Sequence, residues 1–243
     1  MAEEKGRKFR IRVRPTRWNH IGVFLSLVGF ILILICLVGG FTSSGRGIYF
    51  AKVQDANVTA TFGLFGYCTD QAATSKVVCQ QDEAVKQIPF AETVPNILNS
   101  TFPDLFSDEA TLDEAVYPSS VAQPSHDPRI LAAGIICLIC SGAAVAIGFC
   151  KIIFYTHVQD KSYMRGFCAL GASVIALLLV AQTYVMYHNG VEMLNLKYPN
   201  QQATEGPGMI MVGVAFMVFF LSSVAYLQGC FSSNGDNEGY EML

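Results

Sequence analysis

The feature that most constrains this chain is a set of four apolar blocks, each about twenty residues long and free of Asp, Glu, Lys and Arg. A helix rises about 1.5 Å per residue, so roughly twenty apolar residues cross about 30 Å of hydrocarbon. The blocks account for most of the 52% hydrophobic composition of the 243-residue chain. The sequence therefore predicts an all-α membrane protein built as a four-transmembrane-helix bundle.

The distribution of Lys and Arg predicts the orientation, because basic residues beside a span remain on the cytoplasmic side. The tail before the first block has seven basic residues against two acidic ones, whereas residues 43–127 have four basic and eleven acidic ones. Both termini are then cytoplasmic. The expected layout is a cytoplasmic basic tail at 1–19, spans at 20–42, 128–150, 166–187 and 208–230, outer loops at 43–127 and 188–207, a cytoplasmic loop at 151–165 and a cytoplasmic tail at 231–243.

The first block also has two features of a cleavable signal peptide. It follows a basic region and ends in Val38, Gly39 and Gly40, small enough to resemble a cleavage site. Its twenty-two residues exceed the 7–15 residues of an apolar signal core. Retention as the first span is the expected outcome.

The first outer loop contains a strand pattern. Residues 48–53 and 57–67 are rich in β-branched and aromatic side chains, which predicts two strands joined near 54–57. Gly63 and Gly66 interrupt the second run, as at a bulge or a close backbone approach. Cys68 and Cys79 are the only two of eight cysteines expected outside, where thiols are oxidised, so they are predicted to form a disulfide. The second outer loop is expected to add a strand.

Two sequons favour exposure of the same loop on the outside. Asn57 and Asn99 each begin an Asn-x-Ser/Thr triplet and are the predicted glycosylation sites. The acidic residues that follow could attract cations, but they lack the twelve-residue pattern of a calcium loop. We therefore expect neither a metal site nor a cofactor.

Cysteines and the C-terminal tail offer modification and sorting sites. Cys150, Cys168 and Cys230 lie near the predicted cytoplasmic ends of spans, where a thiol can be acylated, although small apolar packing residues are the simpler interpretation. Tyr240 and Leu243 fit a tyrosine-x-x-bulky sorting signal. Small residues in the first two spans predict close helix contacts, and the second span, the richest in them, is expected at the centre of the bundle.

Catalysis and coupled transport are not favoured by this pattern. No ionisable residue lies within the four apolar blocks, whereas pumps and proton relays normally need one. His126 and His188 are predicted outside and His157 inside, so the three cannot meet in one catalytic site. We expect no enzyme and no nucleic-acid partner.

The four spans and the run Gly63, Leu64, Phe65, Gly66, Tyr67, Cys68, followed by Cys79, resemble the claudin-type tetraspan superfamily. That superfamily has Gly-Leu-Trp-x-x-Cys and a second cysteine. Here Phe65 stands in place of Trp, and the run is similar to the fungal Sur/PalI family. The fungal Fig family of mating-fusion calcium regulators has a similar signature.

These resemblances imply a claudin-like fold with a small disulfide-linked extracellular β-sheet. The Sur/PalI resemblance implies a multi-pass plasma-membrane organiser or adaptor, linked to membrane compartments, cell-wall integrity or pH signalling. The Fig resemblance implies the alternative, regulation of calcium influx and membrane fusion during mating. Expected partners are membrane lipids, other membrane proteins or like subunits in the plane, and cell-wall or partner-cell material. Residues Gly63 to Cys68 would either contact these partners or only stabilise the loop.

Overall fold

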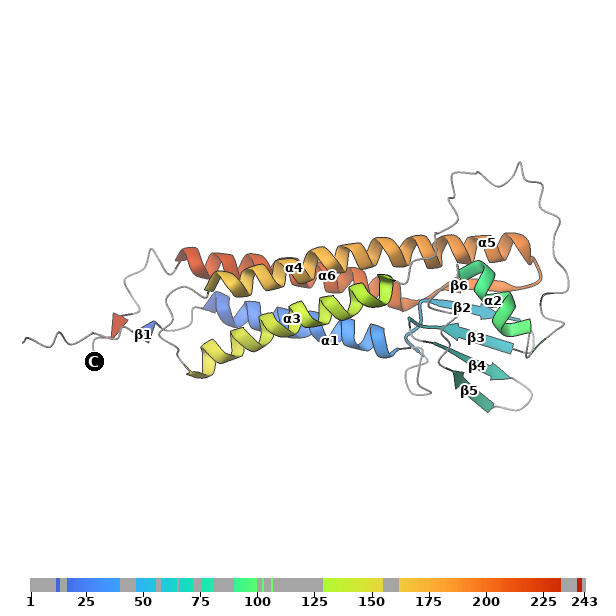
Figure 1. Cartoon of the computed structure of the whole chain (residues 1–243), viewed down its shortest axis with the longest axis horizontal. Coiled ribbons are helices and arrows are strands. Elements are labelled where there is room, and N and C mark those ends of the chain that lie inside the picture. Colours follow the sequence, from blue (N-terminus) through green and yellow to red (C-terminus); the bar gives the residue numbers. More distant parts are fainter. Residues whose placement is uncertain are drawn as a thin grey trace, which may run out of the picture.

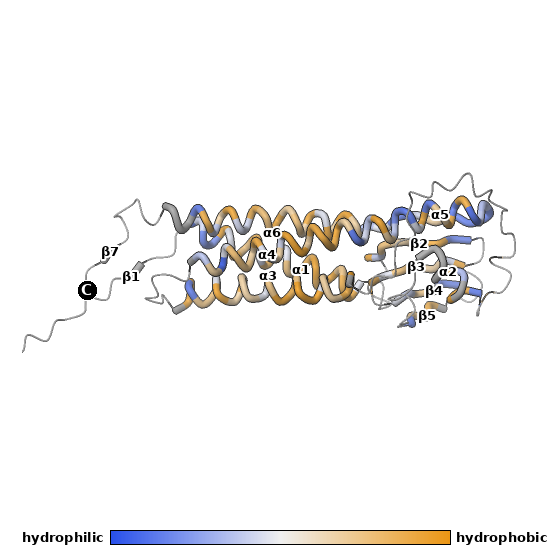
Figure 2. The backbone as a smooth tube through the Cα atoms, turned by 45° about the horizontal axis from the view of Figure 1, so that its top comes forward, coloured by the Kyte–Doolittle hydropathy of each residue, from blue (hydrophilic) through white to orange (hydrophobic). Residues whose placement is uncertain are grey.

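A computed structural model describes residues 12–13, 17–39, 47–55, 58–64, 66–71, 76–80, 90–99, 102, 106, 129–154, 162–232 and 240–241. In this part of the chain, a long helical bundle carries a small sheet at one end (Figure 1). The bundle is predominantly hydrophobic, whereas polar residues gather around the sheet (Figure 2).

Four long helices form the bundle: α1 (Arg17–Val38), α3 (Arg129–Phe154), α4 (Ser162–Thr183) and α6 (Pro207–Ser232). Each contains a stretch that is long and apolar enough to cross a membrane, and these four are the candidate spans within the described residues. The predicted four-helix membrane architecture is confirmed, and the chain is a multi-pass membrane protein by this criterion.

The four helices pack as a ring. Helix α1 packs against α3 and α6, and α4 packs against the same two helices, so α1 and α4 lie opposite each other. The expectation of a central second span is wrong: α3 is the least buried of the four. Its glycines allow α1 to approach closely, because a Cβ added at Gly134 would lie 2.8 Å from Leu37 of that helix.

Small residues also bring α1 and α6 together. A Cβ added at Gly29 would lie 2.5 Å from the Phe219 ring, so this glycine admits an aromatic side chain into the helix surface. Between the same helices, the hydroxyl groups of Ser26 and Ser222 form a hydrogen bond of 2.6 Å. The hydroxyl of Ser222 also forms a 2.8 Å hydrogen bond with the carbonyl of Gly22. Close packing and buried hydrogen bonds are the forces that associate helices in lipid.

The third span continues beyond the bundle. Helix α4 runs into a π-helical turn, η2 (Tyr184–His188), and then into α5 (Asn189–Lys197) beside the sheet (Figure 1). The second outer loop, expected at 188–207, therefore begins as a helix. No proline lies between Ser162 and Tyr198, and Pro199 follows the last helical turn, as is usual where a helix stops.

The sheet has five antiparallel strands in the order β5-β4-β3-β2-β6. Strands β2 (Ala51–Gln54) and β3 (Val58–Phe62) form the predicted strand pair. Strands β4 (Tyr67–Gln71) and β5 (Lys76–Gln80) extend it on one side. Strand β6 (Gln202–Glu205) comes from the segment between α5 and α6 and pairs with β2, which confirms the expected added strand.

Three shorter elements complete the described structure. Helix α2 (Phe90–Asn99) packs against α5 beside the sheet. At the opposite end of the bundle, β1 (Arg12–Val13) pairs antiparallel with β7 (Tyr240–Glu241) (Figure 1). The two tails therefore lie at one end of the bundle and the sheet at the other, as an even number of spans requires.

Candidate functional site

The candidate site is built around the turn between β3 and β4, where the family-like run begins. The amide of Gly63 donates a 2.9 Å hydrogen bond to the carbonyl of Gly66 and closes the turn. This turn places Phe62 opposite Tyr67 in the strand pair, and Leu64 is buried inside it. The two glycines thus form the connection between two strands, rather than a bulge within one.

A tyrosine from the π-helical turn secures this connection. Tyr187 is fully buried, and its hydroxyl donates a 3.0 Å hydrogen bond to the carbonyl of Gly63. Its ring stacks on Phe50, with 5.2 Å between the ring centroids. This hydrogen bond attaches the turn between β3 and β4 to the helix that continues from α4 through η2.

Sequence reasoning did not identify Tyr187 as a site residue. The signal in the sequence is a tyrosine at the end of an apolar block. If such a tyrosine is buried, its hydroxyl usually needs a hydrogen-bond partner. What could not be read from the sequence was the partner, which lies 124 positions away.

The π-helical turn makes a second contact with the sheet. The ring of His188 stacks on Tyr184, and its Nδ1 atom contacts the carboxylate of Glu205 at the end of β6. Turns of this kind are rare and often occur at functional sites. Here one π-helical turn supplies both a buried and an exposed attachment between α4 and the sheet.

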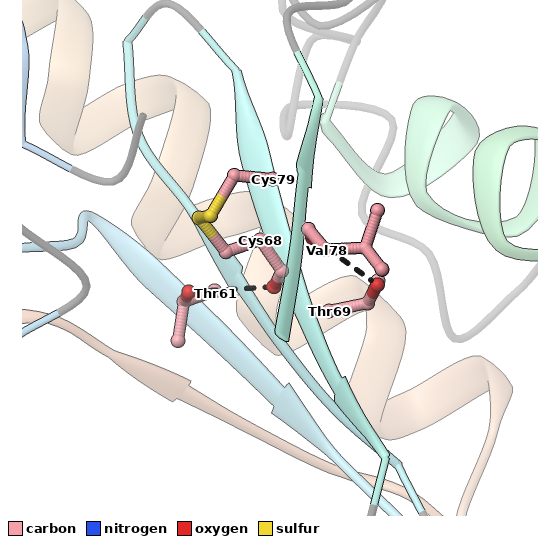
Figure 3. The surroundings of a disulfide bond; sticks show 5 residues. All are labelled: Thr61, Cys68, Thr69, Val78 and Cys79. Carbon is pink, nitrogen blue, oxygen red and sulfur yellow. Dashed lines mark hydrogen bonds between the residues drawn. A yellow bond between two sulfur atoms is a disulfide. The ribbon is translucent and has the colours of Figure 1, made fainter. Parts of the chain in front are cut away.

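The predicted disulfide between Cys68 and Cys79 is present. The two cysteines lie directly opposite each other on β4 and β5, so the bond crosses one strand pair (Figure 3). The hydroxyl of Thr61 donates to the Cys68 carbonyl and that of Thr69 to the Val78 carbonyl, each at 3.4 Å. Strand β5 is the edge of the sheet, and the disulfide fixes this edge to its neighbour.

Tyr67 belongs to the interior of the sheet region. It is 5% exposed, its ring stacks on Phe62 at 5.8 Å, and its hydroxyl donates to the side-chain oxygen of Gln80 at 2.9 Å. Phe65 lies outside the described residues. The contacts made by Tyr67 are therefore those of a residue that stabilises the loop.

One of the two predicted glycosylation sites lies within the described residues. Asn99 is exposed at the end of α2. Asn57 lies outside the described residues. A glycan on Asn99 would project beside the sheet without displacing a buried side chain.

The other predicted modification sites lie on the bundle and the tails. Cys150 is exposed near the end of α3, and Cys168 is half-buried in α4. Cys230 lies in α6, but its side chain is outside the described part, as is Leu243. Tyr240 is in β7, paired with the N-terminal tail.

The described residues contain no group of three His, Cys, Asp or Glu side chains that could hold a metal ion. The fold defines a class of protein, a four-span membrane protein with a disulfide-closed antiparallel sheet attached to one end of its bundle. Comparison of the chain with protein-family models and with curated proteins found no match.

Proposed function

We propose that this protein is a non-enzymatic organiser of the plasma membrane, of the claudin-like tetraspan kind. Its helices would contact lipids and neighbouring membrane proteins, while the outer sheet contacts partner proteins or cell-wall material. The single observation that carries the proposal is the attachment of the motif turn to the bundle through Tyr187. This contact makes the sheet a fixed platform rather than a tethered loop.

The attachment is reinforced where β6 leads into α6. The amide of Gly206 donates to the carbonyl of Phe50 at 2.8 Å, and that of Gly208 donates to the carbonyl of Tyr49 at 3.0 Å. Phe50 is fully buried. Because Tyr49 and Phe50, which lead into β2, are bonded to the start of α6, and β2 pairs with β3, the sheet is held against that span. Such coupling suits a protein that links extracellular contact to lateral position in the membrane.

Two surfaces are suited to contact. The bundle exposes large apolar side chains along its length, including Phe24, Ile139 and Ile210, as expected for helices surrounded by lipid or by other spans. The sheet ends in edge strand β5, where Val78 is 37% exposed. Edge strands are able to pair with a further strand of another chain. The proposed partners are therefore lipids and other membrane proteins in the plane, with cell-wall or partner-cell contact at the sheet.

The plasma-membrane location and the fungal setting rest on the similarity of residues Gly63 to Cys68 to the Sur/PalI pattern. Imaging of the full chain fused to a fluorescent protein in its own cells tests them. We expect stable cortical patches in growing cells. Appearance only at the contact zone of mating pairs would support the calcium and fusion alternative, whereas uniform internal staining would contradict both roles.

Two variants, one in the sheet and one in the bundle, show in that assay whether the sheet is needed for patch formation. Cys79→Ser opens the disulfide and should disperse the patches while the protein still reaches the surface. Cys140→Ser replaces a free, half-buried cysteine in α3 and should leave patches unchanged. If both variants retain patches, the outer sheet does not organise them.

The outward orientation of the sheet has its own test. Treatment of the protein with an endoglycosidase should increase its gel mobility, and Asn99→Gln should reduce that shift because one acceptor is removed. Protection of the sheet from protease added to intact cells, combined with no glycan, would place it on the cytosolic side and overturn the proposed topology.

A further inference from the structure

The two edges of the sheet differ in whether their backbone groups are satisfied. Strand β6 forms one edge, and the side chain of Asn195 on α5 lies against it. The Nδ2 atom of Asn195 donates a 2.9 Å hydrogen bond to the carbonyl of Ala203, and the amide of Ala203 donates a 2.8 Å hydrogen bond to Oδ1. The side-chain amide thus takes the place of a neighbouring strand, and this edge is closed at Ala203.

Strand β5 forms the other edge. Among the described residues β5 pairs with β4 alone, and Val78 in its middle is 37% exposed. Unpaired N–H and C=O groups along an edge strand are a template for pairing with a strand of another chain. The sheet therefore has one closed edge and one open edge.

The pairing of β5 with β4 shows which of its backbone groups point outward. The Cα atoms of Cys68 and Cys79 are 4.0 Å apart, which is typical of a non-hydrogen-bonded pair. The carbonyl of Val78, the preceding residue, accepts a hydrogen bond from the Thr69 hydroxyl and so faces β4. Backbone groups alternate in direction along a strand. The N–H and C=O groups of Val77 and Cys79 therefore point away from β4.

We infer that β5 pairs antiparallel with β5 of a second copy of this chain, in a register centred on Val78. Val77 then lies opposite Cys79 of the second copy, and such a pair exchanges two hydrogen bonds. The two Val78 side chains meet as a non-hydrogen-bonded pair, in which side chains are closest. Lys76 lies opposite Gln80, so like charges are not opposed. The edge is thus complementary to itself in hydrogen bonding, apolar contact and charge.

The direction of this pairing places the two copies in facing membranes. The strands lie beside one another and run roughly along the bundle, so the bundle axis lies close to the plane of the sheet (Figure 1). An antiparallel pair is related by a two-fold axis perpendicular to the sheet, which reverses directions within that plane. The second bundle therefore points the opposite way. Since each bundle crosses its own membrane, the pair connects two membranes across the gap between them.

The closed edge limits the assembly to two copies. A two-fold contact uses the same surface on both partners, and Asn195 prevents the sheet from continuing through β6. One strand pair is a small interface, so many pairs must act together where two membranes meet. The inference rests on the proposed contact role of the sheet and names a second copy of the chain as its partner.

Vesicle bridging by the full-length protein tests this pairing. The protein is reconstituted into two populations of phosphatidylcholine vesicles that carry different dyes, and two-colour aggregates are counted. We expect the wild type to bridge the populations. Val78→Glu alone or Val78→Lys alone should reduce bridging about tenfold, because like charges then meet at the two-fold axis. Vesicles with Val78→Glu mixed with vesicles with Val78→Lys should recover bridging.

Thr204→Glu is the matched control, because Thr204 is exposed on the closed edge and the substitution adds the same charge. Its bridging should equal that of the wild type. An equal loss in Thr204→Glu and Val78→Glu would reveal general repulsion between vesicles and overturn the β5 contact. Failure of the opposite charges to recover bridging would overturn it too. Recovery only when both variants share one vesicle would show pairing within a membrane and overturn the facing arrangement.

Val77→Pro tests the backbone bonds if the charged variants do not fold. Proline is tolerated on an edge strand where the N–H points outward, and it removes the donor that the second copy needs. Bridging should fall about tenfold while the disulfide between Cys68 and Cys79 still forms. Unchanged bridging, or no bridging by the wild type, would overturn the inference.

The outcome is separate from that of the proposed organising function. Vesicle bridging needs no other cellular component, so its failure leaves cortical patches in growing cells unaffected. Loss of those patches with bridging intact would contradict the organising function alone.

Discussion

Replacing Tyr187 with Phe removes one hydroxyl and keeps the ring that stacks on Phe50. The lost hydrogen bond, 3.0 Å from the tyrosine hydroxyl to the Gly63 carbonyl, lies in a fully buried setting. A typical bond contributes about 0.5–1.5 kcal/mol net, and a buried acceptor left without its partner costs about 1–3 kcal/mol. We therefore expect Tyr187→Phe to destabilise the protein by about 1–2 kcal/mol.

The measurement is thermal unfolding of the full chain in detergent, together with hydrogen exchange at the β3–β4 turn. For a chain of this size the loss corresponds to a melting temperature lower by about 2–8 °C. Exchange should increase at the amide of Gly63, because the hydrogen bond from η2 to this turn is lost. The disulfide should remain intact, since strands β4 and β5 are not altered.

Tyr184→Phe is the control for the removal of a tyrosine hydroxyl from the same π-helical turn. Tyr184 is 49% exposed, so its replacement should change the free energy of unfolding by less than about 0.5 kcal/mol. Equal effects of the Tyr184 and Tyr187 substitutions would refute the reasoning. An unchanged exchange rate at the turn in Tyr187→Phe would show that this contact does not attach the sheet.

Three further predictions concern helix packing, the disulfide and the buried serines. Gly29→Ala should lower the free energy of unfolding by about 1–3 kcal/mol, because its Cβ would lie 2.5 Å from an aromatic ring on α6. The control Gly171→Ala should be neutral, because a Cβ at Gly171 would have no atom within 4 Å. Cys79→Ser should lower the free energy of unfolding by about 3 kcal/mol, because the disulfide closes a loop between residues 11 positions apart. Hydrogen exchange in β5 should increase, and unchanged protection of β5 would contradict a stabilising role of the disulfide. Ser222→Ala should cost about 0.6–1.7 kcal/mol because this hydroxyl bonds across to α1. Ser223→Ala should cost less, since its hydroxyl bonds within α6, and the reverse order in unfolding measurements would contradict this account.

The membrane architecture could be predicted because its physical cause is local. Each apolar block is long enough to span hydrocarbon on its own, and a backbone in lipid must satisfy its own hydrogen bonds by forming a helix. The disulfide could also be predicted, since only Cys68 and Cys79 lie in the segments predicted to be outside. These inferences need no knowledge of which helices touch.

The position of the second span could not be predicted in this way. Its many small residues indicate close packing, but they do not say on how many sides a neighbour lies. In the structure Gly134 and Gly142 both face α1, and α3 remains the least buried span. Small residues allow a neighbouring helix to come close, and the arrangement of all four helices decides which helix does so.

The sequence alone determined the number of spans, the first two strand-forming segments and the cysteine pair, because these follow from length, periodicity and charge along the chain. Only the tertiary structure decided that Tyr187 reaches the Gly63 turn, and that the hydroxyl of Ser222 reaches α1. Such contacts join positions far apart in the chain. They depend on helix ring order and on the π-helical turn, neither of which leaves a periodic pattern in the sequence.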